Sequence, residues 1–147
     1  MRVVQHLDVS ANSLFERLVA SIAYDASEAK GVEVDPSRIR KGYKYTKTLG
    51  KKTKGEDEVK VEITEFEPPY KYSCEFKSGN GTNYISYNIT EVDSGIEVEY
   101  TEDMDTNQAF GDANYKLMSF LYSRRAKKQI KKMFKDMEQY IKLDKEF

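Results

Sequence analysis

The sequence predicts an α+β fold in which a curved antiparallel sheet wraps around a long C-terminal helix. Apolar residues recur at helical spacing from about Asp112 to Leu143, which indicates a helix with one buried stripe. Before this helix, residues 43–100 alternate between apolar and polar in several runs, as strands with one buried face do. A sheet and helix arranged in this way usually enclose a cavity, so the fold class favours a protein that binds an apolar molecule. The predicted stripe comprises Leu117, Met118, Leu121, Tyr122, Ile130, Met133, Phe134, Met137, Tyr140 and Ile141.

Length and composition predict one globular domain over residues 1–147. Charged residues make up 33% and hydrophobic residues 39% of the chain, and the net charge of −1 gives no polyelectrolyte character. The lone Cys74 has no partner for an internal disulfide, and no apolar run approaches the length that spans a membrane. We therefore expect a cytoplasmic protein without membrane insertion, present as a monomer or weak homodimer.

The N-terminal third predicts a strand followed by helical segments. Residues 2–9 alternate as a strand does, and Ser10 or Asn12 can cap the helix that follows. Residues 25–40 are ambiguous: a second short helix, interrupted near Gly31, and a turn opened by Pro36 both fit. The apolar stripe of the first helix comprises Leu14, Phe15, Leu18, Val19 and Ile22.

The middle of the chain predicts an antiparallel meander. A charged loop over 51–58 separates the first two strands of the meander, and Pro68–Pro69 ends the second because proline cannot donate to a strand ladder. Turns are predicted at Gly79–Gly81 and at Asp93–Gly95, where glycine admits positive φ. The inward positions of these strands are Tyr43, Tyr45 and Leu49; Val59, Val61 and Ile63; Tyr70, Tyr72, Cys74 and Phe76; Ile85, Tyr87 and Ile89; and Ile96, Val98 and Tyr100.

Three local motifs accompany this order of elements. They are Val9–Ala11 followed by Leu14–Phe15, Ile63–Pro69 followed by Tyr70–Tyr72, and the hairpin of Ile85–Ile89 and Ile96–Tyr100. Together with the topology, they resemble the START-like (SRPBCC, or helix-grip) superfamily over nearly the whole chain. More narrowly, Gly42–Tyr43, the pair Tyr100 and Glu102, and Asn114 are similar to a bacterial family of unknown function within that superfamily. The resemblance implies the helix-grip fold and assigns no activity.

Tyrosines carry the strongest indication of a binding site. The chain has eleven tyrosines, seven phenylalanines and no tryptophan. A ring with one aimed hydroxyl suits the lining of a small-molecule pocket. The alternative is that these residues are core, with hydroxyls that reach water at the edge of the sheet. The candidate cavity residues are Tyr43, Tyr45, Tyr70, Tyr72, Tyr87, Tyr100 and Glu102 on the strands, with Met118 and Tyr122 on the final helix.

Glu102 and the few residues of metal-binding or nucleophilic type complete the candidates. Glu102 continues the inward parity of Tyr100, where it could serve as acid, base or ligand anchor; the reading that we favour is that it ends its strand in solvent. His6 is the only histidine and is expected on the outer face, and Cys74 is expected to be a buried structural residue. No metal-ligand spacing, nucleophile motif, phosphate loop or dinucleotide fingerprint is found, so we expect no metal, no cofactor and no catalytic residue.

Charge is segregated along the chain. Seven basic and no acidic residues lie between Ser123 and Lys135, whereas Glu91–Asp105 carries seven acidic and no basic residues. The basic stretch from Arg124 to Lys135 could be a phosphate-binding face. The reading that we favour is the solvent face of a helix whose late cations complement its dipole, with no nucleic-acid partner.

Three classes of function follow. A protein that binds a small hydrophobic or aromatic molecule between sheet and helix leads, because fold and pocket composition agree on it. An interaction or chaperone-cofactor-like module is the first alternative. A cyclase- or hydrolase-type enzyme is the second, although the sequence shows no convincing acid–base pair. Fold analogy alone does not separate the three.

Overall fold

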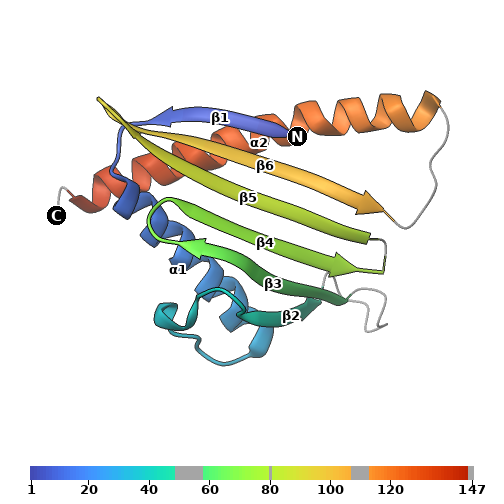
Figure 1. The fold of residues 1–147 in the computed structure, drawn as a ribbon, viewed down its shortest axis with the longest axis horizontal. Coiled ribbons are helices and arrows are strands. Elements are labelled where there is room, and N and C mark those ends of the chain that lie inside the picture. The colour runs from blue at the N-terminus through green and yellow to red at the C-terminus, as the bar shows by residue number, and fades with distance from the viewer. Residues whose placement is uncertain (49–57, 80, 107–112, 146–147) are drawn as a thin grey trace.

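The computed structural model describes the backbone of residues 1–48, 58–79, 81–106 and 113–145, and the side chains of the same ranges except 106–122 and 145. Six strands lie between two α-helices, one near each end of the described chain (Figure 1). In chain order the elements are β1 (Arg2–Leu7), α1 (Ala11–Lys30), the short 3-10 helix η1 (Pro36–Arg38), β2 (Lys44–Thr48), β3 (Glu58–Glu67), β4 (Lys71–Ser78), β5 (Gly81–Val92), β6 (Gly95–Thr106) and α2 (Ala113–Lys145).

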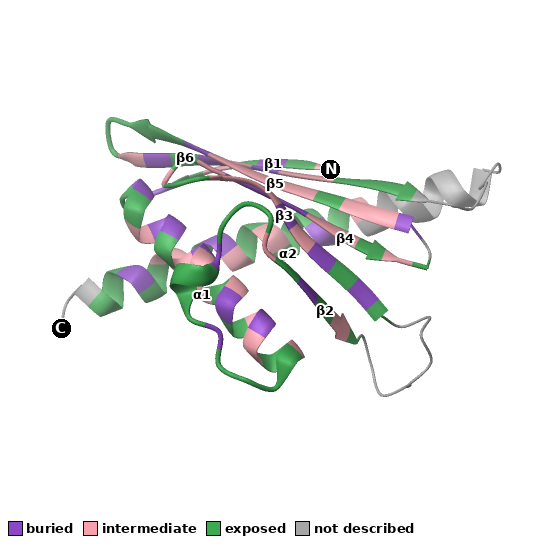
Figure 2. Ribbon diagram, turned by 60° about the horizontal axis from the view of Figure 1, so that its bottom comes forward, coloured by how far each residue is buried: buried purple, intermediate pink, exposed green. Residues whose placement is uncertain are grey.

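The six strands form one antiparallel sheet in the order β1-β6-β5-β4-β3-β2. Both helices lie on the same face of the sheet (Figure 2), which we call the inner face. Helix α2 contacts β1 at one edge, α1 contacts β2 at the other, and the two helices touch. The predicted α+β architecture of a curved antiparallel sheet with a long C-terminal helix is confirmed.

Helix α1 resolves the ambiguous segment that follows the first apolar stripe. The Ser10 hydroxyl caps its start by accepting from the backbone N–H of Ser13. The helix continues without a break to Lys30, and Gly31 ends it in the left-handed conformation at φ +70°. Gly31 therefore terminates one helix and does not interrupt two. Pro36 opens the short helix η1, as expected for proline at a first helical position.

The turn between β5 and β6 requires its glycine. Gly95 has φ +126°, and a Cβ placed on it would lie 2.2 Å from the carbonyl oxygen of Leu7. The turn thus packs directly on the end of β1, and only glycine allows that approach. The predicted turn at this place is confirmed, whereas residues 51–57 of the predicted charged loop and Asn80 of the other predicted turn lie outside the described residues.

The inner face holds the core. Alternate residues of the strands are buried there (Figure 2), and Phe134 of α2 is fully buried against them. In the predicted stripe of α2, Ile141 is buried, Ile130 and Met137 are partly buried and pack on the core, and Tyr140 is 53% exposed. The side chains of Leu117 and Leu121 lie outside the described residues.

The outer face is polar and carries cross-strand ion pairs. The Arg2 guanidinium lies 2.6 Å from the Glu99 carboxylate, and the Lys71 ammonium lies 3.0 Å from Glu65. His6 lies on this face, where its Nε2 is 2.9 Å from the carbonyl oxygen of Ser94. Exposed pairs of this kind add little stability, so the inner face dominates the energetics of the sheet.

Candidate functional site

A row of three tyrosines crosses the middle of the inner face. Tyr72 on β4, Tyr87 on β5 and Tyr100 on β6 are direct cross-strand neighbours. Their ring centroids are 5.6 Å apart for Tyr72 and Tyr87, and 5.1 Å apart for Tyr87 and Tyr100. Phe134 of α2 packs edge-on against the last two, at 6.2 and 6.4 Å. The centre of the face is therefore closely packed aromatic core.

Burial keeps the phenols of this row protonated. Desolvation is the main cause that raises the pKa of Tyr72, Tyr87 and Tyr100 well above the ordinary value of 10.0. The carboxylate of Glu102 adds to the pKa increase of Tyr100 and Tyr87. At neutral pH each hydroxyl is consequently a hydrogen-bond donor and does not act as a base.

A polar group lies beside this row, toward the end of β6. The Tyr100 hydroxyl donates to Oε1 of Glu102 over 3.1 Å, and Nδ2 of Asn83 donates to the same oxygen over 3.3 Å. Glu102 is half-buried and lies on the inner face, so the structure agrees with the inward alternative and not with a strand end in solvent. No ion pair among the described residues involves Glu102.

Asn83 contributes an unsatisfied acceptor to this group. Its Oδ1 is buried and has no hydrogen-bond partner. Exchanging the amide oxygen and nitrogen would aim the oxygen at the Glu102 carboxylate, so the hydrogen bond to Glu102 fixes the assignment. Sequence reasoning missed Asn83, although its parity with Ile85 and Tyr87 on one strand could have placed it inward. We call Tyr100, Glu102 and Asn83 the open cluster.

A second tyrosine–carboxylate pair lies at the opposite edge of the sheet. The Tyr45 hydroxyl donates to Oδ2 of Asp25 over 2.5 Å, and the Lys47 ammonium lies 3.0 Å from the same oxygen. Burial and then Asp25 raise the pKa of Tyr45. We call these three residues the closed cluster, because the carboxylate has both a phenol donor and a cation. Tyr43 is half-buried beside the closed cluster, and the centroid of its ring lies 6.0 Å from that of Tyr45.

The remaining candidates differ in placement. The inward position expected for Tyr70 is wrong, because Tyr70 lies in the turn before β4, is 48% exposed and donates to Glu91. The side chains of Met118 and Tyr122 lie outside the described residues. Cys74 is buried inward as expected, and desolvation raises the pKa of its thiol to about 11. A thiol with that pKa is a poor nucleophile at neutral pH.

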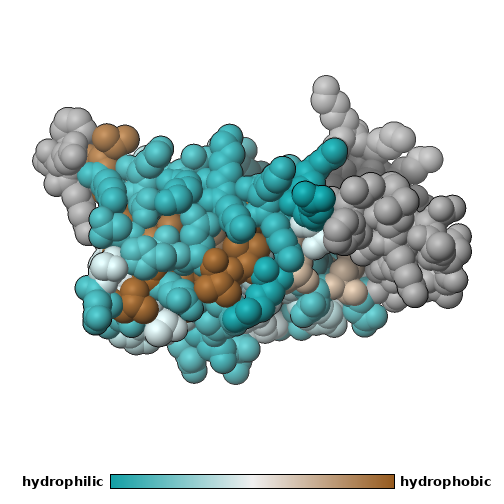
Figure 3. Space-filling view, turned by 90° about the horizontal axis from the view of Figure 1, so that it is seen from above, coloured by the Kyte–Doolittle hydropathy of each residue, from teal (hydrophilic) through white to brown (hydrophobic). Residues whose placement is uncertain are grey.

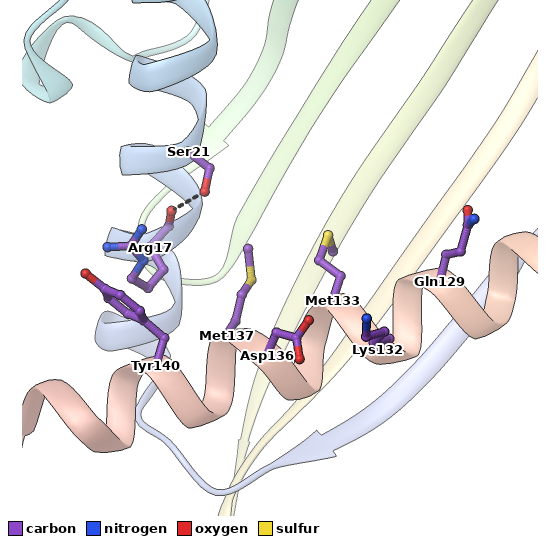
Figure 4. Close-up of a pocket in the computed structure, with 8 residues that line it drawn as sticks. All are labelled: Arg17, Ser21, Gln129, Lys132, Met133, Asp136, Met137 and Tyr140. Atoms are coloured by element: carbon purple, nitrogen blue, oxygen red, sulfur yellow. Dashed lines mark hydrogen bonds between the residues drawn. The ribbon is translucent and has the colours of Figure 1, made fainter.

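A groove that the sequence did not indicate lies between α1 and α2 (Figure 4). It has a volume of about 410 Å³. Arg17 lines it from α1, and its guanidinium lies 4.3 Å from the ring centroid of Tyr140 on α2. Met133 and Met137 also line it and pack partly on the core. The exposed fraction of Tyr140 reflects its position on the wall of this groove.

The described part of the chain holds neither a metal-type cluster of side chains nor a membrane-spanning helix. No three His, Cys, Asp or Glu side chains there come together as a metal site would need. None of its helices combines the length and apolar character that crossing a membrane takes. The seven basic residues from Arg124 to Lys135 are all exposed, in agreement with a solvent face. The face shown in Figure 3 is mainly hydrophilic, with small separate hydrophobic patches.

Sequence comparison identifies the family. The model of the family described as "Domain of unknown function (DUF3284)" matches residues 1–123. The chain belongs to this family. The match to the DUF3284 model covers all six strands and the start of α2. None of the curated proteins matches the chain in sequence.

Solved structures similar to this DUF3284 member share its fold. The protein of unknown function SA2116 from Staphylococcus aureus has a TM-score of 0.70 at 12% identity, over 100% of this chain and 95% of that one. Ara h 8.0201 has a TM-score of 0.62 at 14% identity, over 96% and 95% of the two chains. Bacillus halodurans BH1534 has a TM-score of 0.62 at 9% identity, over 95% and 94%. At these identities, the similarity establishes the helix-grip fold alone.

Proposed function

We propose that this protein is a START-like binder of a small hydrophobic or aromatic molecule, held between the inner face of the sheet and α2. The ligand carries a hydroxyl or amine that donates to the open cluster, and its apolar body lies against the neighbouring inner-face side chains. The observation that carries the proposal is the buried amide oxygen of Asn83 without a partner.

A buried acceptor without a hydrogen bond is costly. Leaving such a group unsatisfied destabilises a fold by about 1–3 kcal/mol, and native proteins keep few of them. A ligand donor placed between Oδ1 of Asn83 and the Glu102 carboxylate would give the amide oxygen its missing hydrogen bond. The negative charge of the carboxylate would strengthen the binding of that donor. The Tyr100 and Asn83 donors already orient that carboxylate. The open cluster is thus suited to a donor-bearing ligand.

The apolar surroundings of the open cluster suit the body of such a ligand. Phe76, Ile85 and Tyr87 lie on the inner face beside Asn83 and Glu102, and each is only partly buried. Elsewhere on the same face, residues such as Ile96 and Val98 are completely buried. Half-buried aromatic and aliphatic side chains next to a few aimed polar atoms are the usual composition of a ligand site.

A matched pair of probes tests the proposal. 1-Naphthol has one hydroxyl donor on an aromatic body, and 1-methoxynaphthalene has the same body without the donor. Binding is followed through the methyl NMR signals of the methionines, because Met104 is the cross-strand neighbour of Asn83. We expect 1-naphthol to shift the Met104 signal saturably and to bind about tenfold more tightly than the ether, the ratio that 1.4 kcal/mol gives.

The variants Asn83→Leu and Asn88→Leu sharpen the test. Both residues lie on β5 and both are partly buried, but their parity places them on opposite faces of the sheet. Asn83→Leu should abolish the preference for 1-naphthol, whereas Asn88→Leu should keep it. Equal binding of the two probes to the unaltered protein, or no shift of Met104, would overturn the proposal.

The cellular setting belongs to the same proposal. The single cysteine is buried as a free thiol, which suits a reducing compartment such as the cytoplasm. We propose a monomer or weak homodimer there, and sedimentation at two protein concentrations measures that state.

A further inference from the structure

We propose that the groove between α1 and α2 is a second, separate binding site, and that it takes a medium-chain monocarboxylate. The carboxylate pairs with Arg17 and the apolar chain lies over Met137 and Met133 (Figure 4). The proposal rests on the groove, on the position of Arg17 and on the charges at the rim, and it does not depend on the function proposed above.

The floor of the groove suits an alkyl chain. Met133 and Met137 line it, and both pack partly on the hydrophobic core. Thioether side chains are unbranched and polarisable, so they adapt to a flexible apolar ligand. The volume of about 410 Å³ lies within the range of small-molecule sites, which is about 300–1,000 Å³.

The shape of the groove favours an extended ligand. Gln129 and Tyr140, the outermost lining residues along α2, are separated by about three helical turns, or ~16 Å at 1.5 Å rise per residue. A straight chain lying along the helix fits that length better than a compact ring system does. This separates the expected ligand from the aromatic molecule proposed for the inner face.

Arg17 is positioned to bind an anion. The Tyr140 ring covers one face of its guanidinium at 4.3 Å, which orients the group and leaves the N–H donors at its edge. None of the ion pairs among the described residues includes Arg17. The hydroxyl of Ser21, the neighbouring lining residue on α1, donates to the backbone carbonyl oxygen of Arg17 and not to a group at the Arg17 guanidinium. An in-plane pair of N–H groups matches a carboxylate with two parallel hydrogen bonds.

The rim charges select a single negative charge. Arg17 and Lys132 are cationic, Asp136 is anionic, and neither Lys132 nor Asp136 forms an ion pair with another described residue. Among the residues that line the groove itself, one carboxylate against two cations leaves a formal charge of +1, and Glu16 and Asp144 line the adjoining hollow on the other side of Tyr140 and Arg17. A monoanion therefore complements the site, whereas an amine of the same chain length would meet two cations.

Three probes of equal chain length test the site: decanoate, decanol and decylamine, each below its aggregation concentration. With methionine-methyl NMR, we expect decanoate to shift the Met133 and Met137 signals saturably and to leave the Met104 signal unchanged. Decanol and decylamine should bind at least tenfold more weakly than decanoate. Equal binding of decanol, or tighter binding of decylamine, would show that the groove does not bind carboxylates selectively.

Variants of two arginines localise the effect. Arg17→Gln should weaken decanoate binding about tenfold, whereas Arg124→Gln, which removes an exposed arginine on another face of α2 that does not line the groove, should change it less than twofold. An unaltered affinity in Arg17→Gln would overturn the proposal. If that variant fails to fold, the methyl shifts in the unaltered protein still decide the location.

The two proposals fail independently. Asn83→Leu should leave decanoate binding unchanged, and Arg17→Gln should leave 1-naphthol binding unchanged. Loss of both probes in one well-folded variant would indicate one shared site and would overturn the separate groove site.

Discussion

The closed and open clusters are built from the same parts and end in different states. In each, an inward tyrosine donates to a carboxylate, and a second nitrogen approaches the same oxygen. In the closed cluster that nitrogen is the Lys47 ammonium, which neutralises Asp25. In the open cluster it belongs to the Asn83 amide, which adds no charge and has its own oxygen unpaired.

The difference separates a stabilising contact from a candidate binding contact. A carboxylate with a phenol donor and a cation can gain little from a further ligand, and losing it leaves two partners unsatisfied. A carboxylate without a cation, next to an unpaired acceptor, gains when a donor arrives. We therefore expect alterations of the closed cluster to change stability and those of the open cluster to change binding.

The largest expected effect comes from the aromatic packing beside the open cluster. Phe134→Ala removes a fully buried ring that contacts Tyr87 and Tyr100, so it should lower the free energy of unfolding by ~3–5 kcal/mol. Urea denaturation measures the loss. The control Leu143→Ala removes a side chain on the same helix that is 58% exposed, and it should cost less than ~1 kcal/mol. Similar losses for the two variants would contradict the burial of the Phe134 stripe.

The next effect breaks the closed cluster. Asp25→Ala leaves the buried Tyr45 hydroxyl and the Lys47 ammonium without their acceptor, and it should cost about 1–3 kcal/mol. Asp25→Asn keeps an acceptor for Tyr45 and should cost less. Glu28→Ala, an exposed position on the same helix, should stay within ~0.5 kcal/mol. Thermal unfolding of the three variants checks this order, and 1-naphthol binding should be the same in all of them.

Much of the fold was predictable from periodicity. The alternation of Val59, Val61 and Ile63 required one buried face, and burial of all three in the structure follows that pattern. Strand parity does not predict the direction of a side chain that lies beyond the end of its strand. Tyr70 has the parity of Tyr72, but β4 begins at Lys71, so the turn directs the Tyr70 ring toward Glu91.

The sites were less predictable because they depend on neighbours distant in sequence. The parity of Glu102 gave its face, but its hydrogen bond from Asn83 depends on the register of β5 and β6, which neither strand's sequence shows alone. Arg17 and Tyr140 lie near opposite ends of the chain, and their contact follows from the way α1 crosses α2. Such contacts between distant segments cannot be predicted from the local sequence pattern.

A smaller effect concerns alkaline pH. Burial raises the pKa of Cys74 from 9.0 to about 11, so the folded protein retains a proton that the unfolded chain releases. Its contribution is complete below pH 9 and is lost as pH rises toward 11. The raised pKa values of Tyr72 and Tyr100 act in the same direction above pH 10.

Urea midpoints at a series of pH values test this linkage, with Cys74→Ala as the matched variant. As pH rises from 9 to 11, the urea concentration at the midpoint should decrease for the unaltered protein. It should decrease less for Cys74→Ala over the same interval. Stability that rises in this interval would contradict the burial of the thiol. The tyrosinate absorbance of the buried rings should appear at the pH at which the protein unfolds, and not at a lower pH.

The smallest effect on stability is expected in the open cluster, and it decides the comparison. Glu102→Gln keeps an oxygen that accepts from Tyr100 and Asn83, and Glu102 is in no ion pair of the described residues, so unfolding should change by less than ~1 kcal/mol. A carboxylate accepts hydrogen bonds roughly twice as strongly as a neutral group. We therefore expect 1-naphthol to bind several-fold more weakly to Glu102→Gln, with 1-methoxynaphthalene unaffected. Asp25→Asn should give the opposite result, a loss of stability with unchanged binding. If Glu102→Gln instead costs as much stability as Asp25→Asn and leaves 1-naphthol binding unaltered, the two clusters are both structural, and the ligand site lies elsewhere.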